Sequence, residues 1–222
     1  MPVAHGLAFD VAHMLAGGLV TVSFLLLFQD RLSALIQFIT LHALVLSLAL
    51  GWQAWVQGAE HLYATAALAL LFKATLIPLA LHRLVRRLHL ERSAEPVVGV
   101  GVTMLFGICL VALSVVVMLP LAAKSPLMWE DLSFALAVVL LGLLVMISRR
   151  NPVGQIIGFL SVDNGMMLAA AGAQGMPFLI ELSIAFSALV ALIVFGVSLS
   201  HISKEFQSVD VHELHRFRGD LP

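Results

Sequence analysis

Seven apolar stretches, separated by short polar or proline-containing breaks, limit what this chain of 222 residues can fold into. A helix needs about 20 mostly apolar residues to cross the hydrocarbon core of a bilayer. The stretches that meet this requirement lie at 7–28, 32–56, 61–82, 96–120, 129–148, 152–172 and 177–200. Charged residues make up only 11% of the chain, whereas a soluble domain carries about 25%. The sequence therefore predicts an all-α, polytopic membrane bundle of about seven transmembrane helices, and it excludes a soluble domain or a disordered chain.

The positions of lysine and arginine predict how these helices cross the membrane. Cytoplasmic loops carry an excess of both residues. With seven helices, every basic residue except Lys73 and Lys124 follows an odd-numbered helix, so that these loops share one side. We therefore expect an N-out, C-in topology, with a four-helix region at 1–125, a three-helix region at 126–200 and a cytoplasmic tail at 201–222. The first stretch contains Asp10 and has no basic segment before it, so we expect a retained helix and not a cleaved signal.

Several classes of function do not fit this composition. The net charge of −1 gives no basic field for nucleic acid. A single cysteine, Cys109, excludes a disulfide framework or an iron–sulfur site built by this chain alone. The histidines show no metal-ligand spacing, and no phosphate-binding loop, nucleophile elbow or zinc-protease motif occurs. We expect no cofactor and no metal, and we expect the chain not to be catalytic alone.

Four ionisable side chains fall inside the predicted helices: His42, Lys73, Asp163 and Glu181. Counting 1.5 Å per residue places Lys73 roughly 18 Å into its helix, with His42 and Asp163 at similar depth and Glu181 in the outer third. Pro78 frees a backbone carbonyl one residue after Lys73, which predicts a polar pocket there. Because buried charges in membranes are costly and often mark ion pathways, we interpret the four as a proton or ion relay. The sequence leaves open an ion pair used only for assembly, a histidine held by packing and a Glu181 that reaches the interface.

The predicted helix at 152–172 carries small residues on one face, at spacings of three and four. They are Gly154, Gly158, Ser161, Gly165, Ala169 and Gly172. Small residues let two helix backbones approach closely in a membrane, so we interpret these glycines as a packing surface. Asp163 points roughly away from that stripe, and we therefore expect protein to cover both faces of this helix.

Three motifs in the last part of the chain carry a family resemblance. Asp163-Asn164-Gly165 forms an acid–Asn–Gly step, Gly175-Met176-Pro177 precedes Glu181-Leu182, and a basic motif runs from Leu214 to Gly219. With Lys73 and Ile77-Pro78, these motifs resemble the component E family of hydrogenase-4-type complexes. Two positions depart from the family pattern, because Asp163 stands where glutamate is usual and Ser187 where relatives often have an acid.

The resemblance implies a role for the chain as a whole. The last three helices of the family are similar to complex I subunit K and to the C component of Mrp-type antiporters, which contribute carboxylates to a proton path. We therefore expect a non-redox membrane subunit of an energy-converting oxidoreductase complex, in the cytoplasmic membrane of a bacterium or archaeon. Its expected partners are larger antiporter-like subunits, a peripheral hydrogenase arm and membrane lipid.

Two other functions stay open from the sequence. A purely structural subunit would hold its buried charges as assembly pairs and would dock larger partners. A free-standing transporter of a small solute would favour two related halves or interrupted helices around a site. We find no convincing internal repeat, and seven helices divide badly into two halves.

Overall fold

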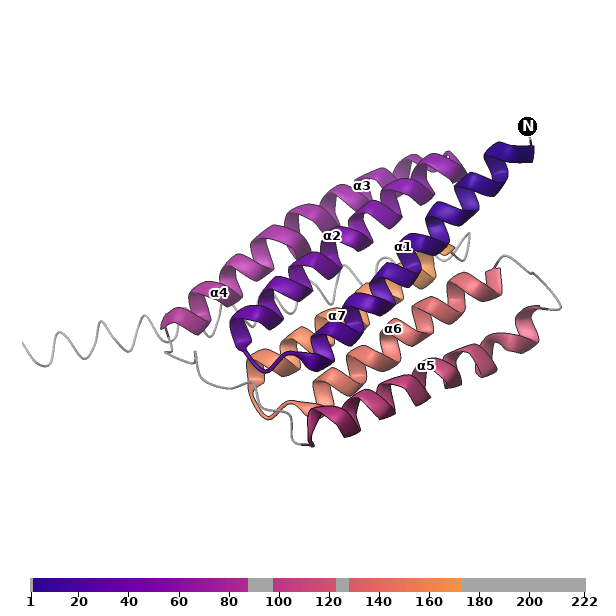
Figure 1. Ribbon diagram of the computed structural model, residues 1–222. Coiled ribbons are helices and arrows are strands. Elements are labelled where there is room, and N and C mark those ends of the chain that lie inside the picture. Colours follow the sequence, from indigo (N-terminus) through magenta and orange to yellow (C-terminus); the bar gives the residue numbers. More distant parts are fainter. Residues whose placement is uncertain (1, 88–97, 123–127, 173–222) are drawn as a thin grey trace, which may run out of the picture.

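The computed structural model describes residues 2–87, 98–122 and 128–172, and its regular elements there are all helices (Figure 1). In chain order they are α1 (Pro2–Phe28), α2 (Leu32–Gln57), α3 (Glu60–Leu68), η1 (Ala69–Leu76), α4 (Ile77–Arg87), α5 (Val100–Ala122), α6 (Met128–Ser148) and α7 (Pro152–Gly172). Six segments of this part of the chain are long and apolar enough to cross a membrane, with α3, η1 and α4 forming one of them. They match the first six predicted spans, and the span expected at 177–200 lies outside the described residues.

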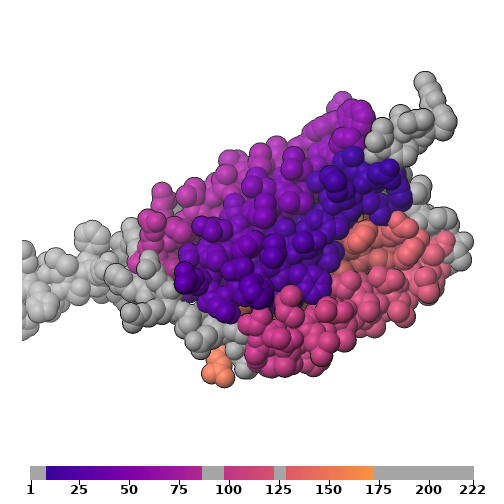
Figure 2. Space-filling view, in the orientation of Figure 1, coloured from indigo at the N-terminus to yellow at the C-terminus, as the bar shows by residue number. Residues whose placement is uncertain are grey.

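The six segments run alternately up and down, and α7 lies behind α1 and α6 in this view (Figure 1). Helix α2 packs against α1, α7 and the α3–η1–α4 segment, while α6 packs between α5 and α7. Of an 18-residue window in α7, 67% is buried, against 17% for α5. On the face shown in Figure 2, α1, α2, α5 and α6 lie in front of most of α7. Among the six described segments, the one with the lowest hydropathy is thus the most buried.

The third membrane segment contains a π-helical stretch, which the sequence did not lead us to predict. Pro78 has no N–H and cannot bond to the carbonyl of Ala74. The N–H of Ile77, just before the proline, bonds to the carbonyl of Phe72, five residues back. The backbone therefore widens over η1 in place of a simple proline kink, and π-helical turns of this kind occur often at functional sites. Lys73 lies inside this stretch.

Helices α6 and α7 approach each other closely through glycines. A Cβ atom at Gly158 would lie 2.5 Å from the backbone nitrogen of Met146, and one at Gly165 would lie 2.7 Å from Val139 Cγ2. From the other side, a Cβ atom at Gly142 would meet the backbone of Val162 at 2.7 Å. No side chain fits at these contacts without a shift of backbone. At the two ends of α7, a Cβ atom at Gly154 would meet Arg149 and one at Gly172 would meet Asp131, each at 3.0 Å.

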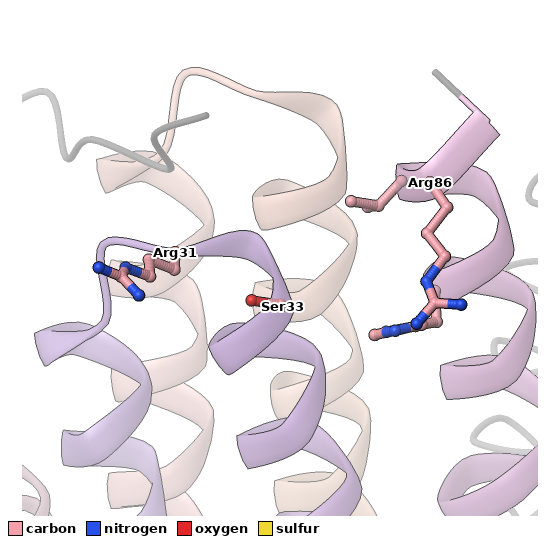
Figure 3. Close-up of a pocket in the computed structure, with 5 residues that line it drawn as sticks. Arg31, Ser33 and Arg86 are labelled. Carbon is pink, nitrogen blue, oxygen red and sulfur yellow. The ribbon is translucent and has the colours of Figure 1, made fainter. Parts of the chain in front are cut away.

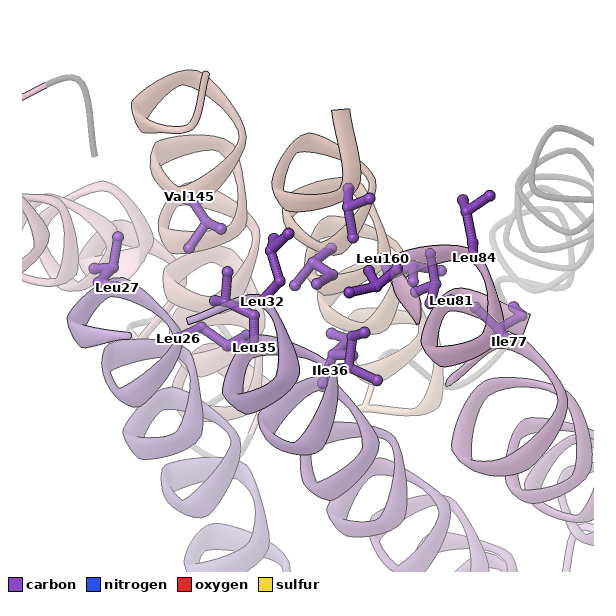
Figure 4. Close-up of a cluster of buried hydrophobic side chains, with 14 of the residues drawn as sticks. Leu26, Leu27, Leu32, Leu35, Ile36, Ile77, Leu81, Leu84, Val145 and Leu160 are labelled. Atoms are coloured by element: carbon purple, nitrogen blue, oxygen red, sulfur yellow. The ribbon is translucent and has the colours of Figure 1, made fainter. Parts of the chain in front are cut away.

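Two clusters of buried apolar side chains hold the bundle together. The first core cluster lies toward the ends of the helices where α1 meets α2, and it includes Leu26, Leu35, Leu81, Val145 and Leu160 (Figure 4). The second core cluster includes Leu19, Leu46, Ala69, Val138 and Met167. Both clusters draw residues from α1, α2, α6 and α7 and from the α3–η1–α4 segment, so each ties the helices together at a different level of the bundle.

Candidate functional site: a buried polar chain across four helices

A lysine and an aspartate form a buried ion pair inside the bundle. Lys73 Nζ of η1 lies 2.6 Å from Asp163 Oδ2 of α7, and the two side chains are 4% and 1% exposed. Lys73 Nζ also donates to Asn164 Oδ1 at 3.0 Å and contacts Met167 Sδ at 3.2 Å. An ammonium group has three donors, and these three contacts satisfy them. The π-helical stretch thus holds a cation that is fully bonded to α7.

Asn164 extends the ion pair to two more helices. Its Nδ2 lies 2.8 Å from His42 Nδ1 of α2, and His42 Nε2 lies 3.0 Å from Ser23 Oγ of α1. Ser23 in turn donates to the backbone oxygen of Leu19 at 2.9 Å. We call these five residues the buried polar chain: Ser23, His42, Lys73, Asp163 and Asn164. None of them is more than 5% exposed.

The buried polar chain lies between the two core clusters. On α1, Ser23 falls between Leu19 of the second core cluster and Leu26 of the first. The same order holds on α2, on the η1–α4 segment and on α7, where Asp163 and Asn164 fall between Leu160 and Met167. An apolar layer therefore borders the polar layer on each side along the membrane-spanning direction. Charges in such a layer are stable only because they are paired and hydrogen-bonded.

Arg149, in the turn between α6 and α7, is buried, although the sequence led us to treat it as a loop residue that marks the cytoplasmic side. It is 1% exposed, and its Nη2 donates to the backbone oxygens of Leu26 and Leu27 at 3.0 Å. These carbonyls belong to the last turn of α1, where the C=O groups have no N–H partner within the helix. Burial lowers the pKa of the Arg149 guanidinium, and the nearby Asp30 opposes this shift. Arginine is effectively always protonated in proteins, and through these two bonds Arg149 ties α1 to the α6–α7 turn.

A basic groove lies at the same end of the bundle. It has a volume of about 360 Å³ and is lined by Arg31, Ser33, His82, Val85 and Arg86. In Figure 3, Ser33 at the start of α2 lies between Arg31 and Arg86, and Arg86 comes from α4. The groove shares no residue with the buried polar chain. With Arg149, it brings basic residues from the loops after α1 and α6 and from the end of α4 to one end of the bundle.

A second group of ionisable residues lies near the start of α6. His13 of α1 forms ion-pair contacts with Glu130 and Asp131, and its ring contacts the tilted ring of Phe9 and meets Phe134 edge to face. From the sequence, the two acids have a structural role at a helix start, and their contacts with α1 agree with such a role. Among the described residues, no group of three or more histidine, cysteine or acidic side chains could hold a metal ion.

The structure brings together three of the four residues that the sequence singled out. Lys73 contacts Asp163 directly, and Asn164 links His42 to Lys73. Glu181 lies outside the described residues. Asn164 and Ser23 were not predicted from the sequence as members of the site, although Asn164 directly follows an intramembrane acid. That adjacency was the available signal, because an amide beside a buried charge needs partners of its own.

The fold and this site define a class of protein: a polytopic helical membrane protein with a charged, hydrogen-bonded layer in its interior. The chain is 31% identical over 165 residues to hydrogenase-4 component E of Escherichia coli K12, which covers 72% of this chain and 76% of that protein. The same values hold for hydrogenase-4 component E of Shigella flexneri. An uncharacterised protein of Mycobacterium tuberculosis is 28% identical over 206 residues, which are 91% of this chain and 94% of that one. The chain belongs to the hydrogenase-4 component E family.

No model of a protein family and no solved structure matches the chain.

Proposed function

We propose that this chain is a non-redox membrane subunit of a hydrogenase-4-like energy-converting complex, in which the Lys73–Asp163 pair takes part in the translocation of protons or Na⁺. Membership in the component E family supports the assignment to such a complex. The buried ion pair is the observation that supports the role in translocation. Charges at this depth are costly and seldom occur in membrane helices without a function.

A simple working cycle for the pair is part of this proposal. A proton that reaches Asp163 neutralises the carboxylate and weakens its hold on the Lys73 ammonium, which is then free to move away from α7. When the proton leaves, the carboxylate draws the ammonium back to a distance near 2.6 Å. The two core clusters keep the polar layer apart from both membrane faces in this state. A cycle therefore needs a conformational change or a partner subunit that opens one side at a time.

The orientation that we propose is N-out and C-in, with seven membrane helices in the whole chain. The basic residues gathered at one end of the bundle support a cytoplasmic position for that end. Single cysteines test the orientation in a Cys109→Ser background. A cysteine at Arg86 should react with a membrane-impermeant thiol reagent only from the cytoplasmic side, and one at Glu60 only from the opposite side. Labelling of both from one side would contradict the topology.

Larger antiporter-like membrane subunits are the partners that we propose. Gentle purification through a tag on the C-terminal tail, followed by identification of the co-purifying chains, tests this assignment. We expect hydrogenase subunits and antiporter-like subunits in a stable assembly within the bacterial or archaeal cytoplasmic membrane. A chain that purifies alone from its native membrane would contradict the proposal.

A purely structural subunit is the competing function, because the ion pair also ties η1 to α7. The two functions differ in the effect of neutralising Asp163. In a structural subunit Asp163→Asn changes stability but leaves ion translocation per redox turnover unchanged. In a translocating subunit, the Asp163→Asn complex still assembles and catalyses redox turnover, but it no longer translocates ions.

A further inference from the structure

The buried polar chain fixes the protonation of His42 from two sides. Ser23 Oγ gives its only proton to the backbone oxygen of Leu19, so its contact with His42 Nε2 at 3.0 Å requires a proton on Nε2. The Asn164 Nδ2 group is a donor, so its contact with His42 Nδ1 at 2.8 Å requires a bare nitrogen there. Both neighbours therefore specify the same form of His42, the neutral imidazole with its proton on Nε2.

Lys73 determines which way the Asn164 amide faces. An ammonium group can only donate, and it bonds to Asn164 Oδ1 at 3.0 Å. The reversed amide would place Nδ2 against the ammonium and Oδ1 against the bare Nδ1 of His42. Two donors would then face each other, and so would two acceptors. A polar group left unmet in a buried site is costly, so the ammonium keeps the amide in its observed orientation.

The reversed orientation of the Asn164 amide becomes favourable once the Lys73 ammonium has moved away from Asn164. Asn164 Nδ2 then faces no cation, and Oδ1 accepts a hydrogen bond from Nδ1 once His42 has bound a proton there. With the ammonium in place, that proton would put a second positive charge beside the Lys73–Asp163 pair, between two apolar clusters. An uncompensated buried charge is strongly unfavourable. The Lys73 ammonium at its site and a protonated His42 therefore exclude each other.

We propose that Asn164 is a positioning residue that interlocks Lys73 and His42. While the ammonium holds the amide oxygen, His42 stays neutral with a bare Nδ1. His42 binds a proton from water at Nδ1 only after the amide has rotated, and no proton passes through the amide itself. The inference rests on the proposed function in one respect, because ion translocation is the process that would move the ammonium.

Nitrogen NMR of the full-length chain in lipid bilayers tests the interlock, with ¹⁵N-labelled histidine and the His42 signals assigned by their loss in His42→Gln. In the unaltered protein we expect a protonated Nε2 and an unprotonated Nδ1. In Lys73→Met the amide is free to turn, and a protonated Nδ1 should appear. The same Lys73→Met exchange in an Asn164→Leu background should produce no further change at His42, because the connection has been removed.

Asn164→Asp provides a second test that keeps both the volume and the lysine. Its carboxylate presents an oxygen to His42 in place of the amide nitrogen, so Nδ1 should gain a proton. A protonated Nδ1 in the unaltered protein would overturn the proposal. So would an unprotonated Nδ1 in Asn164→Asp, or an effect of Lys73→Met that is equally large in the Asn164→Leu background. These measurements need no partner subunit and no redox turnover, so their failure is distinct from a failure of the translocation proposal.

Discussion

Replacement of Lys73 by methionine measures what the buried ion pair contributes to stability. The exchange leaves the Asp163 carboxylate, 1% exposed, without the ammonium that lies 2.6 Å away. Removing one member of a buried ion pair typically costs about 3–5 kcal/mol, because the remaining charge loses its counter-charge. The Asn164 oxygen also loses its donor, which adds about 1–3 kcal/mol unless the amide rotates. The structure therefore predicts a loss near the upper end of what single substitutions cause.

Thermal unfolding of the purified chain in detergent, followed by tryptophan fluorescence, measures this loss through the three tryptophans. For a chain of this size, 1 kcal/mol lowers Tm by about 2–4 °C. The charge effect alone therefore predicts a Tm about 6–20 °C lower for Lys73→Met. Leu76→Met is the matched control, because Leu76 lies in the same π-helical stretch and is 51% exposed. Its Tm should stay within about 2 °C of the unaltered protein.

The double variant Lys73→Met/Asp163→Leu separates a charge effect from a packing effect. Replacing a whole buried ion pair with apolar residues is often neutral or stabilising, so the double variant should recover most of the lost stability. The reasoning is refuted if Lys73→Met melts together with the Leu76→Met control. It is also refuted if the double variant melts no higher than Lys73→Met, because the cost would then come from packing.

Two further exchanges test the helix contacts by the same thermal assay. Gly158→Ala forces a Cβ atom against the α6 backbone and should lower the free energy of unfolding by about 1–3 kcal/mol. In the control Gly17→Ala, the new Cβ atom meets nothing within 4 Å, so Tm should stay equal or rise. Arg149→Met leaves the carbonyls of Leu26 and Leu27 without the Arg149 donor and should lower the free energy of unfolding by about 1–3 kcal/mol or more. In the control Arg150→Met, the exposed neighbour is changed, and the free energy of unfolding should change by about 0.5 kcal/mol or less.

Equal Tm values for the two glycine variants would show that α6 and α7 tolerate a wider separation. Equal values for the two arginine variants would show that solvent replaces the bonds from Arg149 without cost.

Much of the architecture follows from the sequence because membrane helices obey a length rule. Each crossing requires a long apolar stretch, and short breaks such as Gln29-Asp30-Arg31 interrupt the pattern clearly. The first six predicted spans therefore agree with the helices of the structure to within a few residues at most ends. The π-helical stretch was not predictable in the same way. A proline signals a missing hydrogen bond, but the backbone can respond by bending, by widening or by both.

The depth of the charged residues was predictable, and their partners were not. Counting along a helix gives the level of Lys73 and Asp163, because the rise per residue is fixed. Which helices lie side by side depends on packing between distant parts of the chain, and so the bridge from His42 through Asn164 was not foreseen. The burial of Arg149 was missed for a related reason. Counting charges treats every arginine near a helix end as a loop residue, whereas Arg149 donates hydrogen bonds to backbone carbonyls of α1.

The central claim, that Asp163 carries ions as well as holding a lysine, is tested most directly by the ratio of ions translocated to redox turnover. The measurement compares the unaltered complex, Asp163→Asn and the control Asp131→Asn in sealed membrane vesicles, with a pH-sensitive dye for protons and ²²Na⁺ uptake for sodium. Asp131 is a carboxylate of the same chain outside the buried polar chain, so its exchange should leave the ratio unchanged. We expect Asp163→Asn to assemble and turn over, with ion uptake reduced to the level of passive leak. An unchanged ratio in an assembled Asp163→Asn complex would contradict the claim and leave the pair with a structural role.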